Sequence, residues 1–268
     1  MIGTGALELP SVTLCAVTSV NVGATIAAME RCLAQIRFAD AMLFTDVAIV
    51  PTNPAIRVVP IDRLKSIGDY SRFVLVELAA HIASEHCLVV QWDGFVLDAA
   101  VWDQRFLEFD YIGAPWPQFN DGWDVGNGGF SLRSRRLMEC CGRMPLIDGR
   151  SEDLVICRDN RRALEAQGMR FASRELAARF AYERDRTGRR TFGFHGVFNM
   201  VDVVGADAFW NIYCRLDNRS TVYLDEAAIT IALQQGCNAV WRRSKLRIDA
   251  LQFRLKKRLQ ILLGWLVN

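Results

Sequence analysis

Residues His86–Gly94, HCLVVQWDG, join an apolar run to a carboxylate and a glycine at its end. The run predicts a buried strand over Cys87–Trp92, because a short apolar stretch closed by a turn signal is typical of a strand covered on both faces. In an open α/β sheet, ligands bind beyond the carboxyl ends of the strands. Asp93 is therefore expected where a carboxylate oxygen can bind a cation and, through it, a phosphate.

The chain before this stretch alternates between strand and helix patterns. Three more strands are expected at Val12–Val20, Ala41–Thr45 and Ile56–Ile61, and two helices at Ala24–Phe38 and Tyr70–Ala83, the second with Asp69 as its N-cap. Strands separated by helices imply parallel pairing and a sheet with helices on both faces. The turn SVNVGAT (Ser19–Thr25) lacks GxGxxG, and GxxxxGK[ST] is absent from the sequence, which disfavours hydride transfer and P-loop chemistry.

Composition indicates one large α/β domain followed by a basic tail. The 268 residues are 51% hydrophobic, enough to bury a substantial core. Residues 239–268 hold eight Lys or Arg against one Asp, a net charge of +7, which leaves −5 for residues 1–238. We therefore expect a domain at 1–238 and a basic amphipathic helical segment at 239–268. Basic character confined to one end argues against binding of nucleic acid.

Neither the N-terminal region nor the cysteines indicate export. Residues 9–29 carry no charge, but no positive segment precedes them, and Pro10 and Asn21 lie within them. The eight cysteines form no CxxC pair, so reduced, buried thiols are expected. These features predict a cytoplasmic protein.

The pattern loosens after Asp93. Four glycines lie within Gly122–Gly129, and Phe130–Leu132 then leads into a helix that runs through Cys141. Such a cluster lets the backbone approach a ligand closely, although a tight turn before a strand explains it equally well.

Several segments in a fixed order resemble an uncharacterised family of bacterial glycosyltransferase-like proteins with the GT-A fold. They are QWDGF (91–95), Trp102 with FLEFDYIGAPW (106–116), VGNGGFSLRS (125–134), SEDLVICR (151–158) and FGFHG (192–196). The resemblance covers roughly Val12–Tyr213. It implies a single GT-A-like, Rossmann-like domain with a mixed, mostly parallel sheet flanked by helices, and a nucleotide-sugar-dependent glycosyltransferase of bacterial polysaccharide biosynthesis.

The resemblance also implies a metal site. In GT-A enzymes a short acidic motif, often Asp-x-Asp, closes the fourth strand and binds a divalent cation that bridges the donor diphosphate. The matching triplet is Gln91, Trp92 and Asp93, with Asp93 as the ligand. His195 is a second candidate, and an imidazole ligand favours Mn²⁺ over Mg²⁺. The alternatives are a turn-capping role for Asp93 and a hydrogen-bonded core position for His195.

Glu152 and Asp153 follow Ser151 and precede a helix expected to reach about Gln167. Acidic residues in a first helical turn are favoured by the helix dipole alone. By resemblance to inverting GT-A enzymes, a carboxylate at this place acts as general base on the acceptor hydroxyl. Asp153 is the first candidate for this catalytic role and Glu152 the alternate.

The remaining candidates are assigned to the donor or the acceptor. Donor contacts are expected from residues that follow strands or open helices at the same sheet edge, namely Thr18, Ser19, Asn21, Asp46, Asp69, Tyr70, Gln91 and Trp92. Turn and cap chemistry explains most of these equally well. Acceptor contacts are expected from Trp116, Asn127, Gly128 and Gly129, although Trp116 also suits a core.

The last segment alternates basic residues with leucines over 247–267. As a helix it offers an apolar stripe bordered by cations, which suits contact with the inner face of the cytoplasmic membrane. Docking on the domain or on a second subunit is an equal alternative.

Together these features predict transfer of a sugar from a nucleotide-diphosphate sugar to a glycan or lipid-linked acceptor. A metal-dependent phosphoester hydrolase or nucleotidyltransferase that uses Asp46, Asp93 and His195 is one alternative. A catalytically silent glycan-binding or scaffold module is the other.

Overall fold

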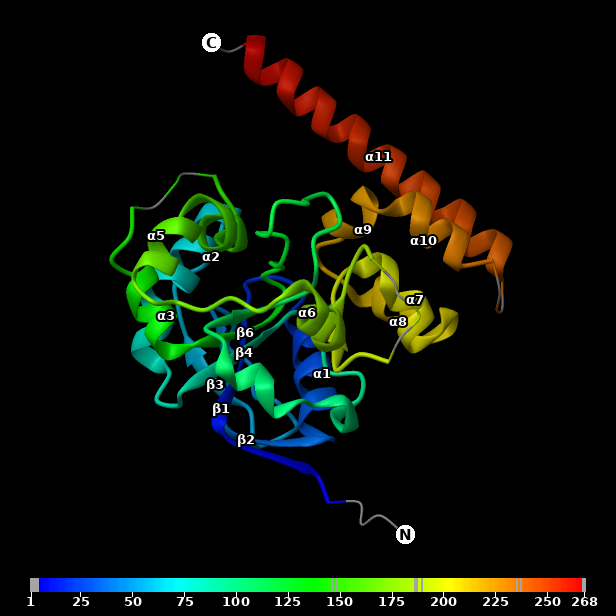
Figure 1. Cartoon of the computed structure of the whole chain (residues 1–268). Coiled ribbons are helices and arrows are strands. Elements are labelled where there is room, and N and C mark those ends of the chain that lie inside the picture. The colour runs from blue at the N-terminus through cyan, green and yellow to red at the C-terminus, as the bar shows by residue number, and fades with distance from the viewer. Residues whose placement is uncertain are drawn as a thin grey trace. The chain divides into compact units, whose positions relative to one another are not determined.

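The computed structural model (Figure 1) describes residues 5–145, 147, 149–185, 188, 190–234, 236 and 238–266, without the side chains of 263–266. The chain divides into two compact units, Met1–His195 and Gly196–Asn268. The boundary expected after residue 238 stays a prediction.

A six-stranded sheet in the order β3-β2-β1-β4-β6-β5 forms the centre of the first unit. Its strands are β1 (Leu7–Val17), β2 (Ile36–Thr45), β3 (Arg57–Pro60), β4 (His86–Val90), β5 (Tyr111–Ile112) and β6 (Phe130–Ser134). The first four run parallel, β6 runs antiparallel to β4, and β5 runs antiparallel to β6. The predicted class, α/β with a mixed, mostly parallel sheet flanked by helices, is confirmed.

Helices and short helical turns surround this sheet. They are α1 (Val22–Leu33), α2 (Ile67–Arg72), the π turn η1 (Phe73–Glu77), η2 (Leu78–His81), η3 (Ala99–Val101), η4 (Gln104–Glu108), α3 (Arg135–Cys141), α4 (Glu152–Leu154), the π turn η5 (Val155–Asp159), α5 (Arg161–Ala166) and α6 (Arg174–Phe180). A separate parallel pair, β7 (Ala181–Tyr182) and β8 (Gly193–Phe194), ends the unit.

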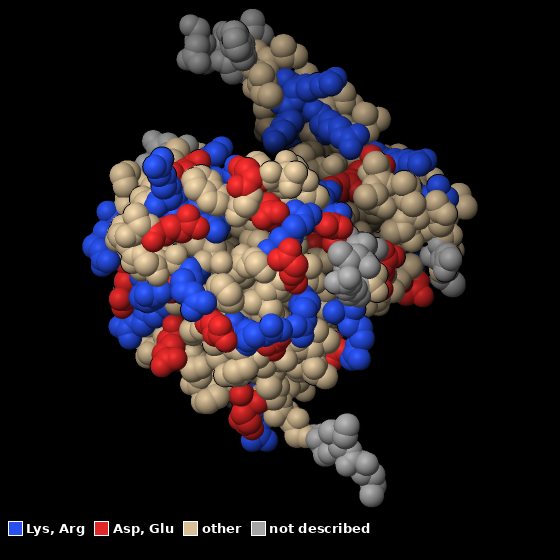
Figure 2. Space-filling view, in the orientation of Figure 1, with Lys and Arg blue, Asp and Glu red and all other residues tan. Residues whose placement is uncertain are grey.

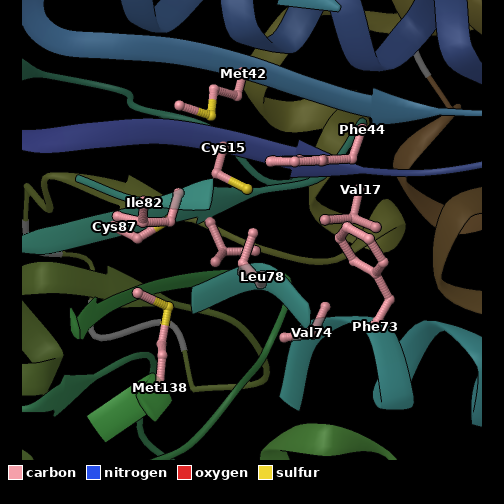
Figure 3. Packing of buried hydrophobic residues seen from close by; sticks show 11 residues of the cluster. Cys15, Val17, Met42, Phe44, Phe73, Val74, Leu78, Ile82, Cys87 and Met138 are labelled. Atoms are coloured by element: carbon pink, nitrogen blue, oxygen red, sulfur yellow. The ribbon is translucent and has the colours of Figure 1, made fainter. Parts of the chain in front are cut away.

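The sheet is buried on both faces because successive residues of its strands alternate between them. Figure 3 shows one face, where side chains of β1, β2 and β4 meet those of η1, η2 and α3. The labelled residues are Cys15, Val17, Met42, Phe44, Phe73, Val74, Leu78, Ile82, Cys87 and Met138. Leu14 and Ala16, which alternate with them, are also fully buried, and α1 contacts β1, β2 and β4.

Three predicted helices differ from the structure. The helix expected over Ala24–Phe38 is α1 and ends at Leu33, because Ile36–Phe38 pair with β1 as the start of β2. The helix expected over Tyr70–Ala83 begins at Ile67, because Ser66 is the N-cap and its Oγ accepts a hydrogen bond from the Asp69 amide at 3.1 Å. Asp69 is therefore the third residue of the helix, not its cap. The helix expected from Ser151 to about Gln167 is interrupted by the π turn η5, so α4 and α5 are separate elements.

The second unit is helical. It contains η6 (Val197–Asn199), α7 (Met200–Val204), α8 (Ala206–Arg215), α9 (Ser220–Leu224), α10 (Glu226–Ala232) and α11 (Ala239–Leu266). The hydroxyl of Tyr213 on α8 donates to Asp249 on α11 at 2.6 Å, and Val222, Ile229, Leu246 and Ala250 are fully buried. The predicted C-terminal helix is thus formed, and it starts at Ala239.

Two further observations concern cysteines and membranes. The cysteines within the described residues are free thiols and are buried except for the exposed Cys214, while Cys237 lies outside those residues. Among the helices of the described chain, none has the length and apolar character required to cross a membrane.

Candidate active site

Asp93 lies in a tight turn at the carboxyl end of β4. The amide of Gln91 donates to the carbonyl of Gly94 at 3.1 Å, and the amide of Gly94 donates to the carbonyl of Gln91 at 3.0 Å. Trp92 and Asp93 are the two residues of the turn between them. β4 is central in the sheet, between β1 and β6. The Asp93 side chain is buried, and its Oδ1 lies 3.8 Å from Nε2 of His195.

The β7–β8 pair brings His195 beside Glu183. Tyr182 pairs with Phe194, and the His195 amide donates to the Tyr182 carbonyl at 3.0 Å, so the next residue on each strand projects to the same side. His195 Nδ1 lies 3.2 Å from Oε1 of Glu183, and Nε2 lies 3.3 Å from Oε1 of Gln91. The imidazole is thus held between two carboxylates, Asp93 and Glu183.

These neighbours control the charge of His195. Burial alone would lower its pKa, but the hydrogen bond to Glu183 and the charges of Asp93 and Glu183 outweigh burial and raise the pKa to about 9. The charge of Asp153 acts in the same direction. Hydrogen bonding to His195 in turn holds the pKa of Glu183 below its usual range, although burial alone would raise it.

Three glycines make room for the imidazole and for the carboxylate of Glu152. A Cβ atom at Gly129 would lie 2.0 Å from His195 Nε2, and one at Gly94 would lie 2.9 Å from His195 Cδ2. A Cβ atom at Gly128 would lie 1.9 Å from Oε1 of Glu152. The glycine-rich segment therefore allows close approach of side chains to its backbone, as its sequence predicts.

Glu152 and Asp153 have different environments. Glu152 is buried and pairs with the fully buried Arg133 at 2.8 Å. Asp153 is partly exposed, and its Oδ2 accepts a hydrogen bond from the Gly128 amide at 3.1 Å. Only Asp153 therefore combines access to solvent with a position beside the glycines.

Asn127 has a left-handed backbone, with φ of 74°. Its Oδ1 accepts from the Gly129 amide at 3.0 Å, and its carbonyl accepts from the Tyr111 hydroxyl at 3.0 Å. Its Nδ2 is buried and has no hydrogen-bond partner among the described residues. A buried donor without a partner is rare in proteins, so this amide is suited to a ligand or a water.

The donor candidates form three groups. Thr18, Ser19 and Asn21 lie in the turn after β1, where the Ser19 hydroxyl accepts from the Leu64 amide at 2.8 Å and Asn21 has a φ of 54°. These contacts stabilise the turn that starts α1.

Tyr70 and Asp69 belong to α2. The Tyr70 hydroxyl accepts from Gln91 Nε2 at 3.2 Å and so contacts the turn that carries Asp93. Asp69 is exposed and accepts from the Lys65 amide at 2.8 Å, a local contact at the start of the helix.

Asp46 follows β2 and lines a cavity of about 450 Å³ with Val47, Val58 and Pro60 among its neighbours. Its Oδ1 is buried without a hydrogen-bond partner in the described part of the chain. This cavity is formed at the ends of β2 and β3.

The two tryptophan candidates are largely buried. Trp92 is 9% exposed and Trp116 is 5% exposed. A Cβ atom at Gly126 would lie 2.2 Å from the Trp116 ring, so the indole packs directly on this glycine. Trp116 supports the glycine segment from the interior and offers little surface to a sugar.

The model of the family described as "Protein of unknown function (DUF5672)" matches residues 53–195, more than half of the chain. The chain belongs to the DUF5672 family. The matched region contains Asp93, the glycine segment, Asp153, Glu183 and His195, and it ends at His195. No curated protein matches the chain in sequence.

Two solved structures are similar to this chain. One is the mannosyltransferase PcManGT from Pyrobaculum calidifontis in complex with GDP-Man and Mn²⁺, with a TM-score of 0.42 and 10% identity over 97% of this chain and 87% of that one. The other is a glycosyltransferase involved in the glycosylation of the major capsid of PBCV-1, with a TM-score of 0.42 and 10% identity over 76% of this chain and 100% of that one. Similarity at this level does not extend to individual residues or ligands.

In this member of the DUF5672 family, Asp93 and His195 are suited to hold a cation together. Glu183 bonds to Nδ1, while Nε2 lies 3.8 Å from Oδ1 of Asp93 and 3.3 Å from Oε1 of Gln91, so a cation at Nε2 would have to displace the proton there. No group of three or more His, Cys, Asp or Glu side chains that could hold a metal occurs among the described residues.

Sequence reasoning missed Glu183 and Arg133. Glu183 lies in the segment AYERD (181–185), which has no motif or periodicity that marks it, and only the pairing of β7 with β8 brings it to His195. Arg133 lies within the quoted segment VGNGGFSLRS, but an arginine on a strand does not indicate burial. Its charge is balanced by Glu152.

Proposed function

We propose that the protein is a glycosyltransferase that moves a sugar from a nucleotide-diphosphate sugar to a glycan or lipid-linked acceptor. The observation that carries this proposal is the grouping at the end of β4. His195 packs on Gly129 and lies 3.8 Å from Asp93, and Asp153 binds the amide of the neighbouring Gly128. The residues proposed for the anionic leaving group, Asp93 and His195, and the carboxylate proposed for the acceptor, Asp153, therefore belong to one region.

The donor half of the site uses Asp93 and His195. Both would hold a divalent cation, with Mn²⁺ favoured over Mg²⁺ because one ligand is an imidazole. Such a cation stabilises the negative charge that the diphosphate gains as the sugar leaves. Gln91, which bonds to Tyr70 and His195, is proposed to hydrogen-bond the donor as well. Asp46 and the turn of Thr18, Ser19 and Asn21 are proposed for the nucleoside.

The acceptor half uses Asp153. Its carboxylate takes the proton of the acceptor hydroxyl while that oxygen forms a bond to the anomeric carbon. The bond from this carbon to the diphosphate oxygen breaks at the same time, and its electron pair leaves with the diphosphate. Asn127 and the backbone of Gly128 and Gly129 border the acceptor, and Trp116 keeps this segment in place from behind.

The hydrolase alternative has less support. It uses Asp46, Asp93 and His195, but Asp46 lines the cavity at the ends of β2 and β3, whereas Asp93 and His195 lie together at the end of β4. A silent binding module would not need a buried carboxylate paired with an imidazole, since both are costly to bury.

The donor site is tested by thermal unfolding with a panel of nucleotide sugars, each with and without Mn²⁺. A ligand that binds the native state raises the melting temperature. We expect one donor class to raise it, and Asp93→Asn and His195→Gln to lose the increase. Asp40→Asn is the matched control, because Asp40 lies within β2 and pairs with Arg57. Failure of every donor to shift the unsubstituted protein would contradict the proposal.

The acceptor site is tested by the release of nucleoside diphosphate. We expect release to require an acceptor, whereas a phosphoester hydrolase would release its product without one. Asp153→Asn should lower transfer by about 10²–10⁴-fold while donor binding persists, because only the proton acceptor is lost. Equal transfer by Asp153→Asn and the native protein would exclude Asp153 as the base.

A further inference from the structure

The helix α11 has two different apolar faces. On one, Leu246 and Ala250 are fully buried, and the Phe253 ring lies 5.1 Å from that of Tyr223 on α9. These three residues are spaced four and three positions apart, so they form one stripe that packs on the helices of the second unit. This face accounts for the docking of α11.

The other apolar face is exposed. It consists of residues spaced three or four positions apart, each 50–60% exposed, namely Ile248, Leu251, Leu255, Leu259 and Leu262. Ile248 and Leu255 each follow a residue of the buried face by two positions, which is about half a turn of helix. The exposed stripe therefore points away from the unit on which α11 packs, and over its length of about 20 Å no described residue covers it.

Charges of one sign lie near this stripe, although Lys257, two positions after Leu255, lies on the side of Phe253 with its Nζ 5.6 Å from that ring. Arg254, Lys256, Lys257 and Arg258 lie among the leucines, and residues 250–268 contain no acidic residue. Arg254 is held by Glu226 of α10 at 3.2 Å, whereas Lys256, Lys257 and Arg258 are exposed. Figure 2 shows Lys and Arg side chains gathered along α11 beside uncharged ones. The segment thus combines an apolar stripe with a local positive field.

We propose that the exposed face of α11 binds the surface of an anionic lipid bilayer, with the leucines inserted at the headgroup boundary and the basic side chains on the lipid phosphates. Helices of this composition lie in the interface plane. Each basic residue near an anionic leaflet adds to the attraction. The proposal stands whether or not the proposed glycosyl transfer is correct.

Charge favours a bilayer over a second copy of the chain. A coiled coil that used Ile248, Leu251, Leu255 and Leu262 would have Arg258 in its seam. It would also bring the basic residues of both copies together without acidic partners, which opposes association. The side chains of residues 263–267, which the predicted contact also included, lie outside the described residues.

The test is sedimentation of the full chain with vesicles of phosphatidylcholine alone and of phosphatidylcholine with phosphatidylglycerol, at low and physiological salt. We expect binding to the anionic vesicles only, and weaker binding at the higher salt. The triple substitution K256Q/K257Q/R258Q should lower binding by about a hundredfold. L255E/L259E should abolish it, because the stripe is then polar.

The matched control is R37Q/R63Q/R72Q, which removes the same charge from exposed positions of the first unit. It should bind as the native chain does, and the melting temperature of each variant checks that it folds. Equal binding to neutral vesicles, no binding to either kind, or equal loss in the control would each overturn the proposal. So would a dimer in sedimentation equilibrium that L255E/L259E dissociates in the absence of lipid.

Discussion

At Gly129, a Cβ atom would lie 2.0 Å from Nε2 of His195, well inside van der Waals contact. The imidazole is also restrained by Glu183 and Gln91, at 3.2 and 3.3 Å. A side chain at residue 129 must therefore displace the imidazole or the backbone that carries it. Because glycine has no side chain, residue 129 leaves the space in which His195 lies beside Asp93.

We expect Gly129→Ala to lower the free energy of unfolding by about 1–3 kcal/mol, the usual cost of overpacking a buried position. Gly23→Ala is the control, since Gly23 lies in α1 with no atom within 4 Å of its Cβ position, and alanine suits a helix better by about 0.5–1 kcal/mol. Urea unfolding measures both. An unchanged midpoint for Gly129→Ala would show that His195 is not packed on this glycine.

Single residues were predictable from the sequence where the chain around them has a pattern. Asp93 follows an apolar strand and precedes a glycine, and this pattern alone suggested a residue at a strand end. Glu183 follows only two residues of strand, so nothing local distinguishes it from a surface glutamate. Its contact with His195 is a long-range pairing of short strands, which local preferences do not encode.

Among the elements, β5, α3 and the segment before α6 are joined through one carboxylate. Asp110, just before β5, accepts hydrogen bonds from Arg136 Nε on α3 at 2.6 Å and from the Arg170 amide at 2.7 Å. The Ser134 hydroxyl donates to it as well. Burial alone would raise the pKa of Asp110, but these hydrogen bonds outweigh burial and hold the pKa below its usual range.

The sign of the pH effect follows from this direction. Since the pKa of Asp110 is lower in the folded chain, its carboxylate adds stability above the unfolded value of about 3.9 and loses it as the pH falls through the folded pKa. We expect Asp110→Asn to lower the free energy of unfolding by about 1–3 kcal/mol at pH 7 and by less at pH 3. Urea unfolding at both values measures this, with Asp62→Asn as the control at an exposed position. An equal loss at both values would contradict the assignment.

The same elements show where sequence patterns fail. The apolar periodicity of 151–167 predicts one helix, but the π turn η5 adds a residue to one turn and separates α4 from α5. At α2 the N-cap position depends on which side chain bonds to which amide, and both Ser66 and Asp69 suit a cap by composition. Parallel pairing of the first four strands was implied by the alternation of strands and helices, whereas the antiparallel β6 follows from packing that no local pattern specifies.

For the whole molecule, the distribution of buried apolar surface predicts which parts open first. β1 is paired on both sides, by β2 and β4, and its residues from Val12 to Val17 are buried. The side chains of residues 254–262 in α11 are all exposed. Segments with little buried surface open locally at low free-energy cost, while central strands open only with the whole domain.

We therefore expect native-state hydrogen exchange to be slowest in β1 and much faster in the amides of residues 254–262, by several orders of magnitude. The difference arises because the outer part of α11 is held mainly by its own hydrogen bonds, with Arg254 bound to Glu226 at its start, whereas β1 amides also lie under helices on both faces of the sheet. Anionic vesicles should slow exchange in 254–262 and leave β1 unchanged, because only the exposed stripe contacts lipid. Slow exchange of 254–262 without lipid, at protein concentrations low enough to exclude dimers, would show that this part of α11 is covered by the chain itself.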